Sequence, residues 1–169
     1  PYIGEEVIDG KDNILAPGFI DIHSHHEGGL EENLEALPVL SQGITTICIG
    51  QDGFSQPMDS LKSRYAQHKP AINLLSYTGH ASLRIKQMGL RGLFRTASDK
   101  EVEGMKLDLE NELKKGSFGL STGLEYEASF YSSKQEVIDL AKVTAAYKGL
   151  YTSHIRSEDI RFQEAIDEI

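Results

Sequence analysis

Short apolar runs alternate with amphipathic stretches along this chain. The runs are apolar nearly throughout, and each has the length of a β-strand; they cover residues 18–22, 45–49, 72–77, 118–121 and 149–153. Strands without polar alternation are typical of a parallel sheet that helices cover on both faces. Lys115-Gly116 and Lys148-Gly149 precede the last two runs, as expected where a helix ends before a strand. The pattern therefore predicts an α/β protein with a parallel sheet.

Two amphipathic stretches carry the start signal of a helix. Ser98 precedes Glu101, and Ser133 precedes Glu136, with the spacing of a capping box, in which the serine binds a free backbone N–H and the glutamate reaches back. Apolar side chains recur every three or four positions after both serines, which gives each helix one apolar stripe. A third helix is expected to begin after Ser157.

Two closures of such a sheet compete: an open doubly wound sheet, and a (β/α)8 barrel, which needs about 250 residues when complete. A chain of 169 residues holds about half of a barrel. No GxGxxG or Walker pattern follows a predicted strand, which weakens the dinucleotide-binding alternative. Residues 1–16 are polar and precede the first strand, so we expect them to end another domain and residues 17–169 to form the barrel part. Because the chain begins with Pro1 and a helical pattern still runs at Ile169, we expect an excerpt of a longer protein.

The composition narrows the possible partners. The formal net charge is −9, whereas binding to nucleic acid or to an anionic membrane needs a basic footprint, so neither is an expected partner. No run approaches the ~18 consecutive apolar residues of a membrane span. Cys48 is the one cysteine, which excludes an internal disulfide and a cysteine-rich zinc site, and it fits a reduced, cytoplasmic setting.

A pair of histidines follows the first predicted strand. His23 and His25 are two residues apart, so on a strand both imidazoles point to the same face and can reach one cation, with Ser24 turned away. A catalytic zinc site takes three protein ligands, often imidazole nitrogens, and keeps one open position. A pair of surface histidines in a loop is the alternative. The buried strand before the pair favours a metal site at the carboxyl ends of the strands, where α/β proteins bind ligands.

Two further candidate ligands follow other strands. His154 comes after the fifth run, and Asp52 comes after the second, between Gln51 and Gly53. Each has a simpler explanation, since a lone histidine is more often a hydrogen-bonded core residue and Asp-Gly forms turns. On one rim with the histidine pair, however, His154 would complete the ligand set and Asp52 could bridge two metal ions.

Three residues on the same rim are candidates for substrate contacts. The hydroxyl of Tyr126 could meet substrate, although packing explains this residue as well. His80 could contact a ligand, support the site from behind, or begin a helix. Arg156 follows a predicted ligand and is also a candidate. His26 and His68 are expected to be structural or solvated.

These stretches resemble the amidohydrolase superfamily and, within it, the N-acyl-D-amino-acid deacylase (D-aminoacylase) family. The resemblance spans nearly the whole chain, in family order, through APGFIDIHSH at 16–25, QGITT at 42–46, GHASLR at 79–84, GSFGLSTGLEY at 116–126 and TSHIR at 152–156. The first stretch belongs to the whole superfamily, whereas the third and fourth point to the deacylases. The resemblance implies a metal-binding (β/α)8 barrel joined to a small β domain, to which residues 1–16 would belong.

The resemblance also implies roles. His23, His25 and His154 would bind one or two divalent ions, and zinc is the expected metal. The family's further histidine and its catalytic aspartate would lie beyond the end of this chain. The expected reaction is hydrolysis of a small-molecule substrate, an N-acyl-D-amino acid, in which Tyr126 would contact the carbonyl oxygen or the substrate carboxylate. One departure is Asp52, which stands where the family commonly has a cysteine ligand; its harder oxygen leaves the metal and the number of ions open.

Two rival functions stay open. A dihydroorotase-like or isoaspartyl-dipeptidase-like hydrolase would use the same histidine pair, but a lysine after the fourth strand would favour it, and residues 116–133 contain none. A barrel that has lost its metal and acts as a binding protein is supported only by Asp52 in place of cysteine. The sequence leaves the acyl group, the preferred enantiomer and the oligomeric state open.

Overall fold

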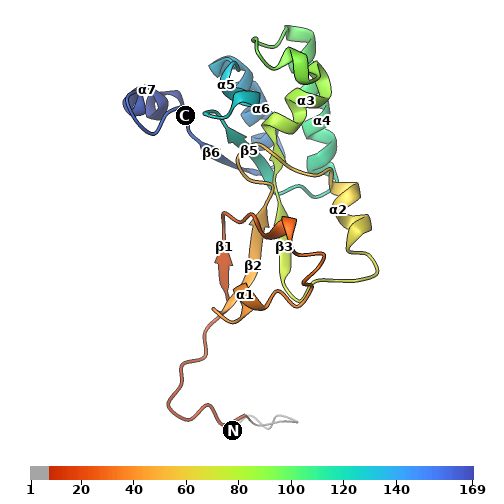
Figure 1. The fold of residues 1–169 in the computed structure, drawn as a ribbon, viewed down its shortest axis with the longest axis vertical. Helices are drawn as coiled ribbons and strands as arrows, with labels where there is room; N and C mark the ends of the chain where they lie inside the picture. The colour runs from red at the N-terminus through yellow and green to blue at the C-terminus, as the bar shows by residue number, and fades with distance from the viewer. Residues whose placement is uncertain (1–7) are drawn as a thin grey trace.

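The computed structural model describes residues 8–169 as parallel strands with helices packed against them (Figure 1). Two three-stranded sheets have the orders β1-β2-β3 and β4-β5-β6, and every pair of neighbours is parallel. The strands are β1 Phe19–Asp21, β2 Ile44–Ile49, β3 Asn73–Ser76, β4 Thr78–Gly79, β5 Gly119–Gly123 and β6 Leu150–His154. The five predicted strands are confirmed, with small shifts of their ends.

The two sheets are continuous through Tyr77. This residue alone separates β3 from β4, and β3 pairs with β2 while β4 pairs with β5. The amide of Tyr77 donates to the carbonyl of Ile49 at 3.0 Å, and the amide of Phe118 donates to the carbonyl of Ser76 at 2.8 Å. Backbone hydrogen bonds therefore continue from one sheet to the other across Tyr77. Counted with β3 and β4 as one strand, five parallel strands lie side by side, which is the arrangement of part of a (β/α)8 barrel.

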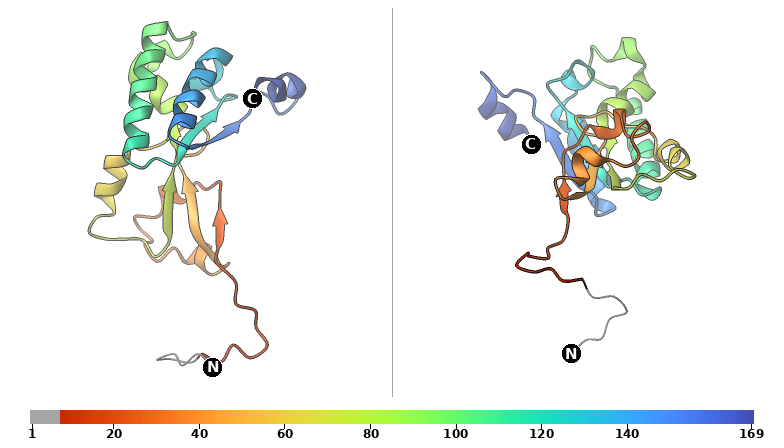
Figure 2. Two further views of the ribbon diagram at one scale, coloured as in Figure 1. Left: turned by 180° about the vertical axis from the view of Figure 1, so that it is seen from behind. Right: turned by 60° about the horizontal axis from the view of Figure 1, so that its bottom comes forward.

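The longer helices gather beside β4, β5 and β6. The described helices are α1 Leu37–Leu40, α2 Met58–Arg64, α3 His80–Met88, α4 Asp99–Lys114, α5 Glu127–Phe130, α6 Lys134–Ala146 and α7 Phe162–Glu168, with 3-10 turns η1 His26–Gly28 and η2 Leu90–Gly92. Seen from behind, α3, α4 and α6 lie together next to the sheet β4-β5-β6 (Figure 2). Their apolar stripes meet β5 in one core, formed by Leu83, Met105, Leu109, Leu113, Leu120 and Leu140.

Both predicted capping sites start helices, but the second glutamate does not reach back. Before α4, the carboxylate of Glu101 accepts from the amide of Ser98 at 2.7 Å, as a capping box requires. Before α6, the hydroxyl of Ser133 accepts from the amide of Glu136 at 3.1 Å. The carboxylate of Glu136 instead turns into the protein, where the residue is 2% exposed. The prediction of a second complete capping box was wrong.

The third helix begins later than predicted. The hydroxyl of Ser157 binds the carboxylate of Asp159 at 2.6 Å and accepts from the amide of Arg161, so a turn follows Ser157. Helix α7 starts only at Phe162. Serine side chains bind nearby groups in turns as readily as they cap helices, which is why the pattern alone misplaced this start.

The outer strands are more exposed than their apolar sequences predicted. β5 is completely buried, but Phe19 and Ile20 of β1 are 67% and 59% exposed, and Leu150 of β6 is 53% exposed. Within residues 8–169, β1 and β6 each have one neighbouring strand. Burial on both faces therefore holds for the centre of the sheet only.

The segment before β1 leads away from the body of the molecule (Figure 2). Residues 8–16 are exposed and contain no strand. The predicted β-domain piece, residues 1–16, lies partly outside the described residues, and it stays a prediction.

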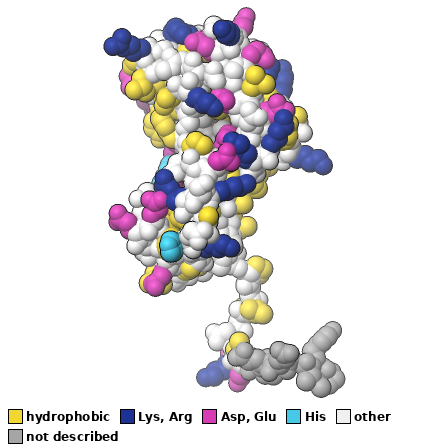
Figure 3. Space-filling view, turned by 90° about the vertical axis from the view of Figure 1, so that its right-hand side faces the viewer, with side chains coloured by type: hydrophobic (Ala, Val, Ile, Leu, Met, Phe, Trp, Pro, Cys, Tyr) yellow, Lys and Arg dark blue, Asp and Glu magenta, His cyan; other side chains and the backbone are white. Residues whose placement is uncertain are grey.

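Opposite charges are interspersed over the helices. Acidic and basic side chains are mixed on the face seen in Figure 3. Among the ion pairs of the helices, Lys86 pairs with Asp108 at 2.6 Å and Lys115 with Asp59 at 2.7 Å. Exposed pairs of this kind contribute about 0–1 kcal/mol each, so the buried core dominates stability. Among the described helices, each is too short or too polar to cross a membrane.

Candidate metal centre

The carboxyl ends of three strands bring the predicted metal ligands together. His23 and His25 follow β1, Asp52 follows β2, and His154 ends β6. The Nε2 atoms of His23 and His25 lie 3.3 Å apart. Oδ2 of Asp52 lies 3.0 Å from Nε2 of His25 and 3.5 Å from Nε2 of His23. His23, His25 and Asp52, here the ligand cluster, each offer one ligand atom within 4.8 Å of the others.

Strand geometry turns both histidines to one side. The amide of Ser24 donates to the carbonyl of Cys48 at 3.0 Å, which extends the pairing with β2 past the end of β1. The side chain of Ser24 is buried, whereas His23 and His25 are exposed. Alternation along an extended backbone therefore places both imidazoles on the open face, as the sequence predicted.

The loop after β2 presents Asp52 in a left-handed backbone conformation. Its φ is +54°, between Gly50 at +73° and Gly53 at +82°. Aspartate is one of the few non-glycine residues that tolerate this region, because its short polar side chain binds locally. The side-chain amide of Gln51 donates to the carbonyl of Ile22 at 2.9 Å and so ties the loop to the end of β1.

The end of β5 supports the same loop from the other sheet. The hydroxyl of Ser121 donates to the carbonyl of Gly50 at 2.6 Å and accepts from the amide of Gly53 at 3.3 Å. Gly123 leaves room for the loop, because a Cβ there would lie 2.3 Å from the carbonyl oxygen of Asp52. The carboxylate is thus positioned by both sheets.

His154 approaches the ligand cluster from β6. Its Nδ1 lies 3.9 Å from Oδ1 of Asp52, and its Nε2 lies 2.8 Å from a carboxylate oxygen of Glu125. A carboxylate beside one ring nitrogen favours the proton on that nitrogen. With Nε2 donating to Glu125, Nδ1 carries the lone pair and lies on the side of Asp52.

Tyr126 lies over His154. Its hydroxyl is 3.2 Å from Nδ1 of His154, and the ring centroids are 4.7 Å apart. Partial burial, followed by the negative charges of Asp52, Glu125 and Glu158, raises the pKa of Tyr126 above its ordinary value. The hydroxyl therefore stays protonated at neutral pH and can donate a hydrogen bond.

The donor set fits a divalent metal ion. Two ligands at tetrahedral zinc lie about 3.3 Å apart when each bond is about 2.0–2.1 Å, which matches the distance between the two Nε2 atoms. Oδ1 of Asp52 is buried and has no hydrogen-bond partner among the described residues. A buried carboxylate oxygen without a partner is costly unless a cation or water satisfies it. Imidazole nitrogen and carboxylate oxygen are both zinc ligands.

A cavity of about 260 Å³ opens beside the ligand cluster and gives a small ligand access to it. Its lining contains three of the predicted site residues, His25, Asp52 and Tyr126, together with Glu27, Gln51 and Phe54. Polar ligand groups and an aromatic ring thus share one opening.

The structure does not bring His80 into the cluster. His80 begins α3 and is completely buried, and its Nε2 donates to a carboxylate oxygen of Glu136 at 2.8 Å. Arg84 binds both oxygens of the same carboxylate, at 2.6 and 2.7 Å. Burial lowers the pKa of His80, so the imidazole is neutral. A completely buried side chain has no direct contact with a ligand in the opening.

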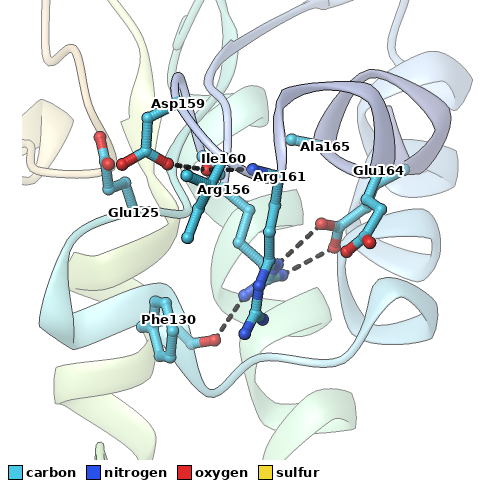
Figure 4. Close-up of a pocket in the computed structure, with 10 residues that line it drawn as sticks. Glu125, Phe130, Arg156, Asp159, Ile160, Arg161, Glu164 and Ala165 are labelled. Atoms are coloured by element: carbon cyan, nitrogen blue, oxygen red, sulfur yellow. Dashed lines mark hydrogen bonds and ion pairs between the residues drawn. The ribbon is translucent and has the colours of Figure 1, made fainter.

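Arg156 also uses its donors within the protein (Figure 4). It pairs with Glu168 at 2.7 Å and donates to the backbone carbonyls of Phe130 and Ser132. Arg156, Phe130 and Glu168 line a second cavity, of about 340 Å³, which reaches Glu125. Arg156 and Glu125 therefore line the same cavity, but the guanidinium of Arg156 is bound to backbone carbonyls and to Glu168.

His26 and His68 lie outside the ligand cluster, and one is structural and the other solvated. His26 binds the hydroxyl of Ser24 through Nδ1 at 2.7 Å, and His68 is exposed. The sequence reasoning missed Glu125 and Gln51, although both neighbour predicted site residues in their loops. It also took Glu136 for a helix cap, and nothing in the local pattern distinguishes the two uses of that glutamate.

The chain is similar in sequence to named deacylases. No protein-family model matches it. Two curated relatives from Alcaligenes xylosoxydans xylosoxydans, an N-acyl-D-aspartate deacylase and an N-acyl-D-glutamate deacylase, are 34% and 32% identical to it. The alignments cover 98% and 96% of this chain, which spans 38% of the length of each relative.

The chain is also similar in fold to solved structures of such enzymes. The N-acyl-D-glutamate deacylase of Bordetella bronchiseptica, complexed with zinc and a phosphonate inhibitor, has a TM-score of 0.85 and 30% identity, over 90% of this chain and 36% of that one. A D-aminoacylase described by its binuclear metal centre has a TM-score of 0.82 and 27% identity, over 90% and 37%. In sequence and in fold, this chain belongs to the N-acyl-D-amino-acid deacylase (D-aminoacylase) family of the amidohydrolases.

Proposed function

We propose that this chain contributes the metal-binding part of an active site that hydrolyses the amide bond of N-acyl-D-amino acids. The observation that carries the proposal is the convergence of His23, His25 and Asp52, from two neighbouring strands, with ligand atoms within 4.8 Å of one another. Membership of the deacylase family supplies the substrate class, because the relatives are named for N-acyl-D-aspartate and N-acyl-D-glutamate.

His23, His25, Asp52 and His154 would hold one or two divalent ions, with zinc as the proposed metal. The nitrogen and oxygen donor set supports zinc, as does the zinc reported for the structurally similar Bordetella bronchiseptica enzyme. A carboxylate with one oxygen toward the histidine pair and the other toward His154 suits a bridging position. When bound, such an ion supplies Lewis acidity and activates water at neutral pH.

The chain's own residues orient the ligands and the substrate. Glu125 accepts the Nε2 proton of His154 and so directs Nδ1 toward Asp52. The protonated hydroxyl of Tyr126, at the rim of the cavity, is the proposed donor to the substrate carbonyl oxygen or carboxylate. His80 and Arg156 receive no substrate contact in this proposal, because their polar atoms bind Glu136, Glu168 and backbone carbonyls.

The test is metal analysis of the purified protein together with hydrolysis of matched substrates. We expect bound zinc and release of free amino acid from N-acetyl-D-glutamate or N-acetyl-D-aspartate, with little release from the L enantiomers. A dihydroorotase-like enzyme would instead open the ring of dihydroorotate. A protein without bound metal and without activity on either class would support the metal-free binding barrel and overturn the proposal.

A further inference from the structure

A short segment carries Tyr126 and is held by two arginines from outside it. The segment, residues 126–132, consists of Tyr126, the single turn of α5 and the two residues after that turn. A helix of one turn is not stable by itself, because nucleation fixes many dihedral angles for few hydrogen bonds. Tyr126 is also the N-cap of α5 and makes no side-chain cap hydrogen bond. Contacts from elsewhere must therefore fix its position.

Arg84 binds this segment from α3. Its Nε donates to the carbonyl of Ala128 at 2.8 Å, and one terminal nitrogen donates to the carbonyl of Arg95 at 2.8 Å. Glu136 holds the other terminal nitrogen through both carboxylate oxygens, and His80 binds the same carboxylate at 2.8 Å. Arg84, Glu136 and His80 are all almost completely buried.

Arg156 binds the same segment from the end of β6. It donates to the carbonyl of Phe130 (Figure 4) and, at 3.2 Å, to the carbonyl of Ser132. Both oxygens of Glu168 hold the guanidinium, each at 2.7 Å. The segment thus offers the carbonyls of alternate residues to two arginines, and each arginine has its own carboxylate.

The chemistry of these contacts indicates positioning. A buried ion pair contributes little net stability, because removing both charges from water offsets their attraction, and apolar residues of the same volume would stabilise as well. A planar guanidinium with several donors instead fixes where its partners lie. Arg84 and Arg156 donate these hydrogen bonds to α5 and to the two residues that follow it.

The ring of Tyr126 lies between the end of β5 and His154. A Cβ at Gly123 would lie 2.6 Å from Cδ2 of Tyr126, so the ring rests on the glycine at the end of β5. On the other side its hydroxyl lies 3.2 Å from Nδ1 of His154. A shift of the segment would move this hydroxyl away from the ligand cluster.

We propose that Arg84 and Arg156 are positioning residues that fix residues 126–132 and thereby hold the Tyr126 hydroxyl beside His154. This inference rests on the proposed function for its kinetic test, since Tyr126 is there the donor to substrate.

The kinetic test is a double-mutant cycle in the metal-loaded protein. Arg156→Lys keeps the charge but removes the fork of donors, and we expect kcat/KM to fall on the order of tenfold, with bound zinc unchanged. In the Tyr126→Phe background the same substitution should cost less than about twofold, because coupled residues are not additive. Equal losses in both backgrounds would overturn the proposal, since a general structural effect acts independently of Tyr126. Arg161→Lys, in the same cavity lining, is the matched control and should leave kcat/KM unchanged.

A second readout needs no activity. With 3-fluorotyrosine incorporated, the ¹⁹F resonance that disappears in Tyr126→Phe reports the position of this ring. We expect it to shift in Arg156→Lys and in Arg84→Lys, but not in Arg161→Lys. An unmoved resonance in the two positioning variants would contradict the proposal. If the protein lacks deacylase activity, the proposed function fails while this spectrum still tests the positioning; if Arg84→Lys does not fold, Arg156→Lys still decides.

Discussion

Oδ1 of Asp52 and Nδ1 of His154 lie 3.9 Å apart, although Asp52 follows a strand of one sheet and His154 ends a strand of the other. Oδ2 of the same carboxylate lies 3.0 Å from Nε2 of His25. One aspartate therefore connects the histidine pair after β1 with the histidine that ends β6. Replacing Asp52 therefore distinguishes its two possible roles, as a metal ligand and as a turn residue.

Asp52→Asn is predicted to keep the loop and lose the ligand. Asparagine tolerates the left-handed conformation as well as aspartate does, so the free energy of unfolding should change by less than about 1 kcal/mol. Bound zinc and activity should both fall at least about tenfold, because the charged oxygen ligand is gone. Elemental analysis and a urea titration measure the two effects, with Asp12→Asn in the exposed segment before β1 as control. Full metal content in Asp52→Asn would assign this residue to the turn alone.

His25→Ala is predicted to release metal without unfolding the protein. His25 is exposed and offers Nε2 to the ligand cluster, so its loss leaves an incomplete site but no cavity in the core. Bound zinc should drop with little change in thermal stability of the metal-free protein. His68→Ala replaces an exposed histidine outside the cluster and should change neither quantity. Equal metal loss in both variants would leave the ligand assignment without support.

Gly123→Ala is predicted to displace the site by steric contact. The added Cβ would meet the carbonyl oxygen of Asp52 at 2.3 Å and the ring of Tyr126 at 2.6 Å, and backbone cannot yield cheaply. Forcing atoms into a packed region costs about 1–3 kcal/mol of unfolding free energy, and metal affinity should fall with it. Gly28→Ala is the matched control, because a Cβ there has no atom within 4 Å. Calorimetric metal titration and urea unfolding of both variants provide the comparison.

The buried His80 and Glu136 pair predicts a loss of stability in acid. Burial lowers the pKa of His80 below 6.5, so below that pH the unfolded chain takes up a proton that the folded protein refuses, and the unfolding free energy falls. Burial alone would raise the pKa of Glu136, but His80 and Arg84 overcome it and lower the pKa below 4.5. The stabilisation from Glu136 is therefore present above pH 4.5 and is lost as pH falls further.

Urea titrations of the metal-free protein between pH 7 and pH 5 measure the His80 contribution. His80→Gln keeps an amide donor for Glu136 but cannot titrate, so its unfolding free energy should decline less steeply over this range than that of the original protein. Parallel declines would mean that other groups cause the pH dependence.

Much of the fold was predictable because its signals are local. The five strands, the helices after Ser98 and Ser133, and the position of His23 and His25 on one face follow from apolar runs, capping spacing and two-residue alternation. Parallel strands whose carboxyl ends meet at one edge then bring Asp52 and His154 to the same place. These inferences need no knowledge of which side chains pack against which.

Tertiary structure decided what the local pattern left ambiguous. Glu136 has the spacing of a capping residue, yet its carboxylate binds His80 and Arg84, because these two buried donors from α3 bind it more strongly than the backbone amide of Ser133 would. Arg156, equally consistent with a substrate contact, is bound to Glu168 and to backbone carbonyls. The partner of a polar side chain depends on residues distant in sequence and on burial. The sequence by itself therefore determined the strands and the places of the candidate ligands, whereas only the folded structure decided which polar groups face the opening and which bind one another inside the protein.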